Sequence, residues 1–234
     1  MAFDPVHQIQ LGVRRSGELL RRNGVVPAQS GARQHLEGEE REEFYDSGEK
    51  QLVQLAAAIE EYTGFRLEGR RALDFGCGVG RLALPLAKRC EHVYGLDVSA
   101  SILDAADRNA KRMGLTNVEW LMPDGLGALS GHYDLVVSHF VFQHIPSREG
   151  ERVLTTLVQG LRTGGAGALH FTLRPRLSSR QMVRALGYWY QLTNSYSLDR
   201  LGRLLAGEGI TVWHVRRFEP RGQYPTATII FRKD

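Results

Sequence analysis

Short apolar runs alternate with amphipathic stretches through the central part of the chain. The apolar runs predict strands buried on both faces, and the stretches between them carry apolar residues at helical spacing and predict helices. The predicted strands are 71–75, 92–96, 118–122, 133–138 and 166–173, and the predicted helices are 81–89, 101–113 and 149–161. Because strands that alternate with helices need crossover connections, this pattern predicts an α/β domain with a parallel sheet.

The flanks of this core have different patterns. Upstream, Leu52, Leu55 and Ile59 recur at helical spacing and predict a helix over 39–62, with Ser47–Gly48 as a candidate break. Downstream, an aromatic stretch interrupts the strand and helix rhythm. We expect an N-terminal helical addition or lid over 1–68, a main domain over 69–234, a helical cap inserted at about 176–197, and late strands over 210–215 and 226–231.

A glycine loop follows the first predicted strand, which ends in an acid. Asp74 precedes Gly76, Gly78 and Gly80, and Arg81 opens the next helical pattern. Glycine permits tight turns and lets a ligand lie against bare backbone, and the following helix offers unpaired N–H groups. The glycine spacing differs from the Gly-x-Gly-x-x-Gly dinucleotide fingerprint, and an acid here would repel a pyrophosphate. An acid beside a basic residue instead suits a ligand tail that resembles an amino acid.

Two further acids close the next two predicted strands. Asp97 ends the second strand, where a carboxylate can accept hydrogen bonds from both hydroxyls of a ribose, and Val98 beside it can press on a purine. Asp124 follows the third strand and can accept from the amino group of an adenine. Because the carboxyl ends of parallel strands share one edge of the sheet, the three acids and the glycine loop predict one nucleoside-binding site.

Composition and charge change this picture little. The 234 residues are 42% hydrophobic and 24% charged, as in a soluble globular protein. Two cysteines give neither a disulfide framework nor a metal-ligand cluster, so we expect a reducing cytoplasm and no metal. We expect no signal peptide and no membrane span. The net charge of +4 comes from dispersed arginines, which favour a solvated surface over a nucleic-acid interface.

These motifs together resemble class I S-adenosylmethionine-dependent methyltransferases. The matching segments are 74–81, 95–99, 123–125 and 133–138, within roughly residues 70–175. The resemblance implies a three-layer Rossmann-like fold with a mostly parallel seven-stranded sheet, whose antiparallel last strand is inserted beside its neighbour. It also implies S-adenosyl-L-methionine as the cofactor and S-adenosyl-L-homocysteine as the product. The expected cofactor residues are Asp74, Gly76, Gly78, Arg81, Asp97, Val98, Asp124, Gly125 and Ser138.

The stretch after the fourth strand, 138–145, is expected beside the methyl group. It lacks the Asp/Asn-Pro-Pro-Tyr/Phe tetrapeptide that similar enzymes use on the exocyclic amines of bases. His139 and His144 are candidate general bases, because histidine titrates near neutrality. His170, in the fifth strand, points either into the site or into the core. The candidate substrate contacts are Phe44, Tyr45, Gln143, Tyr188 and Tyr196, and core packing is the alternative for the four aromatic residues.

The favoured function is therefore methyl transfer to an O, N or C nucleophile of a small molecule by direct displacement. Such a reaction needs alignment and exclusion of water more than a fixed catalytic residue. The alternatives are an RNA or protein methyltransferase, and a partner subunit that binds the cofactor without catalysis. A nicotinamide-dependent dehydrogenase is disfavoured by the glycine spacing. We expect a monomer or a homodimer, with a small-molecule substrate favoured over nucleic acid and no membrane partner.

Overall fold

The protein was analysed as a computed structural model that describes residues 37–174, 194–210, 213–218 and 225–234. The strands are β1 Arg71–Phe75, β2 His92–Leu96, β3 Val118–Leu121, β4 Tyr133–Ser138, β5 Leu161–Thr172, β6 Trp213–Phe218 and β7 Thr226–Arg232. The α-helices are α2 Gly38–Thr63, α3 Ala83–Ala87, α4 Ala100–Arg112, α5 Ser147–Gly160 and α7 Leu198–Gly207. Short 3-10 helices, η2 Pro123–Leu129 and η3 Phe142–His144, follow β3 and β4.

The strands form one seven-stranded sheet in the order β3-β2-β1-β4-β5-β7-β6. β1 pairs in parallel with β2 on one side and with β4 on the other. The strands β1 to β3 extend the sheet in one direction, and β4 and β5 extend it in the other, so the order reverses at the junction between β1 and β4. β7 lies between β5 and β6 and is antiparallel to both. The predicted mostly parallel sheet with an inserted antiparallel last strand is therefore confirmed. In open α/β sheets, ligands bind at the carboxyl ends of the strands where the order reverses.

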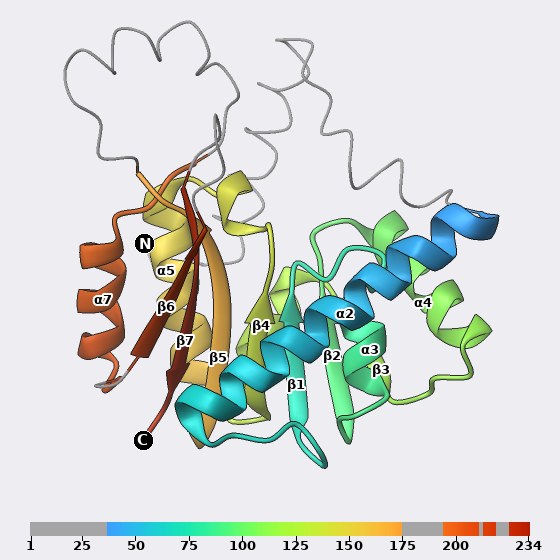
Figure 1. Ribbon diagram of the computed structural model, residues 1–234, viewed down its shortest axis with the longest axis horizontal. Coiled ribbons are helices and arrows are strands. Elements are labelled where there is room, and N and C mark those ends of the chain that lie inside the picture. Colours follow the sequence, from blue (N-terminus) through green and yellow to red (C-terminus); the bar gives the residue numbers. More distant parts are fainter. Residues whose placement is uncertain (1–36, 175–193, 211–212, 219–224) are drawn as a thin grey trace, which may run out of the picture.

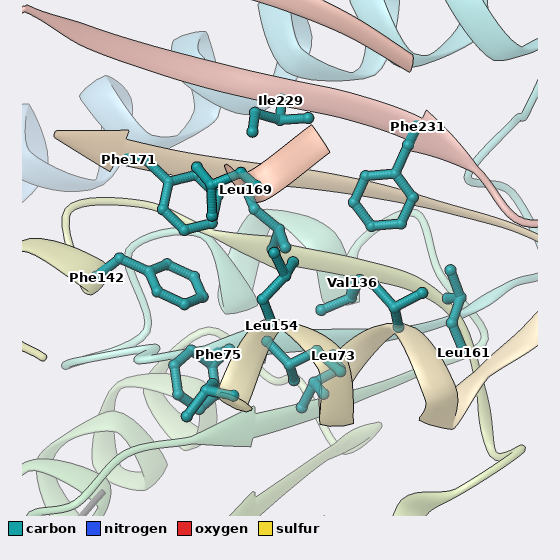
Figure 2. Packing of buried hydrophobic residues seen from close by; sticks show 14 of the residues in the cluster. Leu73, Phe75, Val136, Phe142, Leu154, Leu161, Leu169, Phe171, Ile229 and Phe231 are labelled. Carbon is teal, nitrogen blue, oxygen red and sulfur yellow. The ribbon is translucent and has the colours of Figure 1, made fainter. Parts of the chain in front are cut away.

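Helices cover both faces of this sheet and make three layers. α2 crosses one face, which it shares with α3 and α4, and α5 and α7 lie on the other (Figure 1). Side chains of β1 alternate between the two cores: Leu73 and Phe75 pack toward α5, whereas Ala72 packs toward α2. Figure 2 shows Leu154 of α5 among the apolar side chains of the strands. Among the described residues, no helix combines the length and apolarity needed to cross a membrane.

Lys233, the residue after β7, joins the end of that strand to the carboxyl end of α5. Its ammonium donates to the carbonyls of Val158, Gln159 and Leu161, at 2.9, 3.0 and 2.8 Å. These carbonyls lie at the carboxyl end of α5, where a helix favours a positive charge. The main chain of Lys233 also pairs with Gly164 and Gly165 at the start of β5.

Several predicted boundaries were wrong, for identifiable reasons. α2 continues through Gly48. The glycine is there because the backbone of Arg81 packs closely against the helix: an added Cβ would lie 2.1 Å from the Arg81 carbonyl oxygen. α3 begins at Ala83 instead of 81, because the glycine loop and its turns extend that far. β5 begins at Leu161 and takes in the predicted turn, with an irregular register opposite β4. β6 lies three residues later than predicted, because Ile210 is buried at the end of α7.

The predicted N-terminal addition lies partly outside the described residues. Its described part is mainly α2, which packs on β5 and β7 as a layer of the main domain. A lid role for 1–68 stays a prediction. Of the predicted cap over 176–197, only 194–197 are described. There Tyr196 makes a parallel bridge to Leu173, the residue that follows β5.

Candidate active site

The glycine loop is fixed against the end of β2. The N–H groups of Gly76 and Cys77 both donate to the carbonyl of Leu96, at 2.7 and 3.0 Å. Gly76 has a φ of 76°, and an added Cβ would lie 2.2 Å from a methyl of Val141. Gly78 has a φ of 56°, and a Cβ there would meet open space. Gly76 is thus required for packing, whereas Gly78 is the glycine whose bare backbone a ligand can approach.

Asp74 is a buried acid with an unused acceptor. Its side chain is 2% exposed, and it accepts a hydrogen bond from the backbone N–H of Ala83 at the start of α3. Its Oδ2 is buried and has no hydrogen-bond partner. Burial raises the pKa of Asp74 to about 7, although the Arg81 guanidinium opposes the shift. A buried carboxylate oxygen without a donor is costly, and a cationic ligand group would relieve that cost.

Asp97 lies beside Gly78, as expected. Its two carboxylate oxygens accept from the N–H groups of Gly78 and Ser99, each at 3.1 Å. Burial raises its pKa, and these backbone hydrogen bonds oppose the shift. Asp97 therefore joins the end of β2 to the glycine loop and fixes an acidic group at the edge where a ribose is predicted.

The remaining predicted cofactor residues divide into two groups. Val98 is partly buried against the core, and Asp124 is exposed in the first turn of η2, where Gly125 follows it. These positions lie at the expected strand ends. Ser138 differs, because its buried hydroxyl donates to the carbonyl of Phe75 at 2.9 Å. That hydroxyl joins β4 to β1, and its predicted contact with the cofactor stays a prediction.

Arg81 reaches from the glycine loop to the end of β4. Its guanidinium lies 3.2 Å from Nδ1 of His139. Because arginine can only donate, Nδ1 must accept, and the neutral ring carries its proton on Nε2. Burial lowers the pKa of His139 to about 3, with contributions from His170 and Arg81. His139 therefore presents an N–H at Nε2, which favours a hydrogen-bond donor over the predicted general base.

Three rings gather at the ends of β4 and β5. The centroid of His139 is 4.1 Å from that of Phe140 and 4.8 Å from that of His170. His170 is 7% exposed, and burial lowers its pKa to about 4. The open question about His170 is thereby answered, since its ring contacts the site residues His139 and Phe140. Phe140 was not among the predicted site residues, although its place between His139 and His144 after a predicted strand was the available indication.

The predicted aromatic contacts from α2 pack on the glycine loop instead. Phe44 packs against Val79 and the neighbouring helix α4. The Tyr45 hydroxyl donates to the Val79 carbonyl at 3.0 Å, and burial raises its pKa to about 12. Both side chains therefore support the loop from outside, in agreement with the alternative of core packing.

Tyr196 is also a core residue, which corrects its predicted substrate role. It is 1% exposed, and its hydroxyl lies 3.0 and 2.7 Å from the carbonyls of Phe142, the first residue of η3, and Ile145, which follows η3. Gln143 lies in η3, and its amide nitrogen is 3.2 Å from Nε2 of the exposed His144. The predicted base role of His144 stays a prediction. Tyr188 lies outside the described residues.

Comparison with known proteins identifies the class. Residues 72–165 match the family described as a methyltransferase domain. A magnesium-protoporphyrin O-methyltransferase from Synechocystis sp. is 35% identical over 92 residues, which are 39% of this chain and 40% of that relative. A ribosomal protein L11 methyltransferase from Dechloromonas aromatica is 32% identical over 127 residues, which are 53% of this chain and 39% of that relative. The matched segments span at most 40% of these relatives' length.

Solved structures extend the likeness to the whole fold. The crystal structure of the Synechocystis magnesium protoporphyrin IX methyltransferase with bound SAH has a TM-score of 0.67 and 22% identity. The alignment covers 94% of this chain and 99% of that one. Other curated relatives are named for ubiquinone biosynthesis and for 23S rRNA methylation. Residues 72–165 thus match a methyltransferase domain, and the described residues have the predicted Rossmann-like methyltransferase fold.

Proposed function

We propose that the protein transfers a methyl group from S-adenosylmethionine to a small molecule. The observation that carries the cofactor assignment is the orphaned Oδ2 of Asp74, buried beside a glycine loop in which Gly78 faces open space. A dinucleotide's pyrophosphate would add negative charge next to this acid. The ammonium of an amino-acid tail instead supplies the missing donor, and ion pairing is strongest for groups removed from water.

The chain's own residues then have distinct roles toward the cofactor. Asp74 accepts from its ammonium, Arg81 pairs with its carboxylate, and Asp97 accepts from its ribose hydroxyls. Asp124 accepts from the adenine amino group, while Val98 lies against the adenine ring. When bound, S-adenosylmethionine supplies a methyl group activated by the adjacent sulfonium.

The acceptor lies on the side of the rings at the ends of β4 and β5. There His139 offers Nε2–H, which orients an acceptor atom by a hydrogen bond while Arg81 holds the other ring nitrogen. Neutral imidazoles suit this role, because a charged ring would repel a sulfonium. The His139 and His170 rings also exclude water from the reacting atoms, which favours direct displacement.

A small acceptor is favoured over RNA or protein by the recessed position of these groups. His170 is 7% exposed, and His139 is only partly exposed. A compact molecule can enter to reach such side chains, whereas a folded macromolecule needs an exposed reacting surface. The curated relatives include both small-molecule and macromolecular methyltransferases, so they do not decide the acceptor.

Calorimetric titration with S-adenosylmethionine, S-adenosylhomocysteine and NAD tests the cofactor assignment. We expect micromolar binding of the first two and none of NAD. Asp97→Ala should lose most of this affinity, because the ribose hydroxyls lose their acceptor. Asp107→Ala is the matched control, since Asp107 is an acid on α4 that pairs with Lys111. Binding of NAD alone, or unchanged affinity in Asp97→Ala, would refute the assignment.

Transfer of radioactive methyl from labelled cofactor tests the acceptor class. We expect turnover with members of a small-molecule panel and none with total RNA or a protein lysate. If RNA is the acceptor, transfer to RNA will be present and binding will weaken steeply with salt. If the chain is a non-catalytic partner subunit, it will bind the cofactor and methylate none of these acceptors.

A further inference from the structure

Phe140 combines a strained backbone with an exposed aromatic ring. It lies two residues after the end of β4, and its φ of 60° is the one positive value of a non-glycine residue in the described part of the chain. Its side chain is 51% exposed. The left-handed region disfavours residues that carry a Cβ, and strain of this kind gathers at functional sites.

Packing explains the turn but not the choice of phenylalanine. Val141 is wedged against Gly76, and Phe142 is fully buried beside Phe75 and Phe171, so the chain must turn sharply before them. Glycine or asparagine would adopt this conformation at lower cost. An exposed phenylalanine gains little from burial in return. About half of the side chain is thus available for contact with a ligand.

The ring of Phe140 is held in a defined orientation by the two imidazoles. Its centroid is 4.1 Å from His139 and 4.7 Å from His170, with interplanar angles of 73° and 68°. Both contacts are of the edge-to-face kind, which aromatic pairs prefer. The ring is thus packed against two imidazoles, and half of the side chain is exposed beside His139.

We propose that Phe140 is the surface on which the methyl acceptor stacks, and that this acceptor is a flat aromatic or heteroaromatic ring. The inference rests on the proposed methyl transfer and names the substrate class of the same site. A flat ring stacked on Phe140 brings a polar substituent toward His139. Phe140 then selects the ring, and His139 orients the reacting atom. Stacking of this kind increases affinity by about tenfold.

A matched pair of probes tests the ring preference. 2-Naphthol and its saturated counterpart decahydro-2-naphthol share the hydroxyl and the ring skeleton, and only the first is flat and aromatic. Calorimetry on protein saturated with S-adenosylhomocysteine should give up to about tenfold tighter binding of 2-naphthol. The preference should fall to less than about twofold in Phe140→Leu, which keeps an apolar side chain. Phe218→Leu, an equally conservative change at an exposed phenylalanine of β6, should keep it.

Thermal unfolding checks that the variants remain folded. Phe140→Leu keeps an apolar side chain but loses the two edge-to-face contacts, so its melting temperature should fall by only a few degrees. Equal binding of the two probes, no binding of 2-naphthol, or a preference that survives Phe140→Leu would overturn the inference. Failure of the protein to bind S-adenosylhomocysteine would instead count against the proposed function.

Discussion

Replacing Asp74 by asparagine should stabilise the free protein and weaken its binding of the cofactor. The folded pKa of about 7 lies above the ordinary value of 3.8, so the folded state holds the Asp74 proton more tightly than the unfolded state. Stability from this group is therefore present at low pH and is lost as pH rises from about 4 to about 7. Asparagine keeps the size and an acceptor oxygen but does not ionise, so the variant lacks this loss.

The magnitude follows from the width of the pH window. Between about pH 5 and 7, the unfolded carboxyl is ionised and the folded one is still mostly protonated, so each pH unit costs about 1.4 kcal/mol. The stability difference between Asp74→Asn and the unchanged protein should therefore grow by about 3 kcal/mol from pH 5 to pH 8. At roughly 2–4 °C per kcal/mol for a chain of this size, the gap in melting temperature should widen by about 6–12 °C.

Thermal unfolding at both pH values measures this directly, with Asp107→Asn as the control that should show no widening. The same variant should bind S-adenosylhomocysteine at least about tenfold more weakly, because a hydrogen bond to a charged group contributes about 1.5–3 kcal/mol. If the melting temperatures of the variant and the unchanged protein change in parallel with pH, burial of the Asp74 carboxylate does not destabilise the free protein, and the reasoning is refuted. Widening without loss of affinity would show instead that this destabilisation is unrelated to the cofactor.

Three further substitutions have defined outcomes. Gly76→Ala should lower stability by about 1–3 kcal/mol in denaturant unfolding, and Val141→Ala in the same chain should restore part of it, because the new methyl overlaps Val141. Tyr196→Phe should cost about 1–3 kcal/mol without changing cofactor affinity, because two main-chain carbonyls at η3 lose their donor. His139→Ala should reduce kcat at least about tenfold while calorimetric affinity for S-adenosylhomocysteine stays within about twofold; equal losses in both would assign His139 to cofactor binding.

The central strands were predictable because burial on both faces leaves a continuous apolar run. β1, β2 and β4 begin and end where the pattern placed them. The predicted helix break at Gly48 was wrong. From sequence alone, a glycine that ends a helix cannot be distinguished from one that leaves space for a carbonyl packed against the helix, here that of Arg81. The boundaries of β5 and β6 depend on pairing with partners far along the chain, which local patterns do not encode.

The positions of the three predicted acids were predictable for a similar reason, since each lies at or just after the end of a strand that the pattern defines. The roles of side chains beyond those ends were not. Ser138 and Tyr196 bear polar groups that suit a ligand, yet tertiary packing directs both toward main-chain carbonyls. The tautomer of His139 depends on Arg81, 58 residues earlier in the chain. The backbone strain at Phe140 is visible only in three dimensions.

The position of β7 has a consequence for how the protein is made. This strand follows every other described helix and strand along the chain, yet it pairs on both sides in the sheet and receives α2 on its face. A ribosome therefore synthesises β5 and the apolar side of α2 long before the strand that packs against them exists. Pairing between strands that are far apart in the sequence is slow, and until it occurs it leaves apolar surface and unpaired strand edges exposed to solvent. Nascent chains stalled before residue 226 should be strong clients of chaperones and proteases, even though the glycine loop and its acids are already complete.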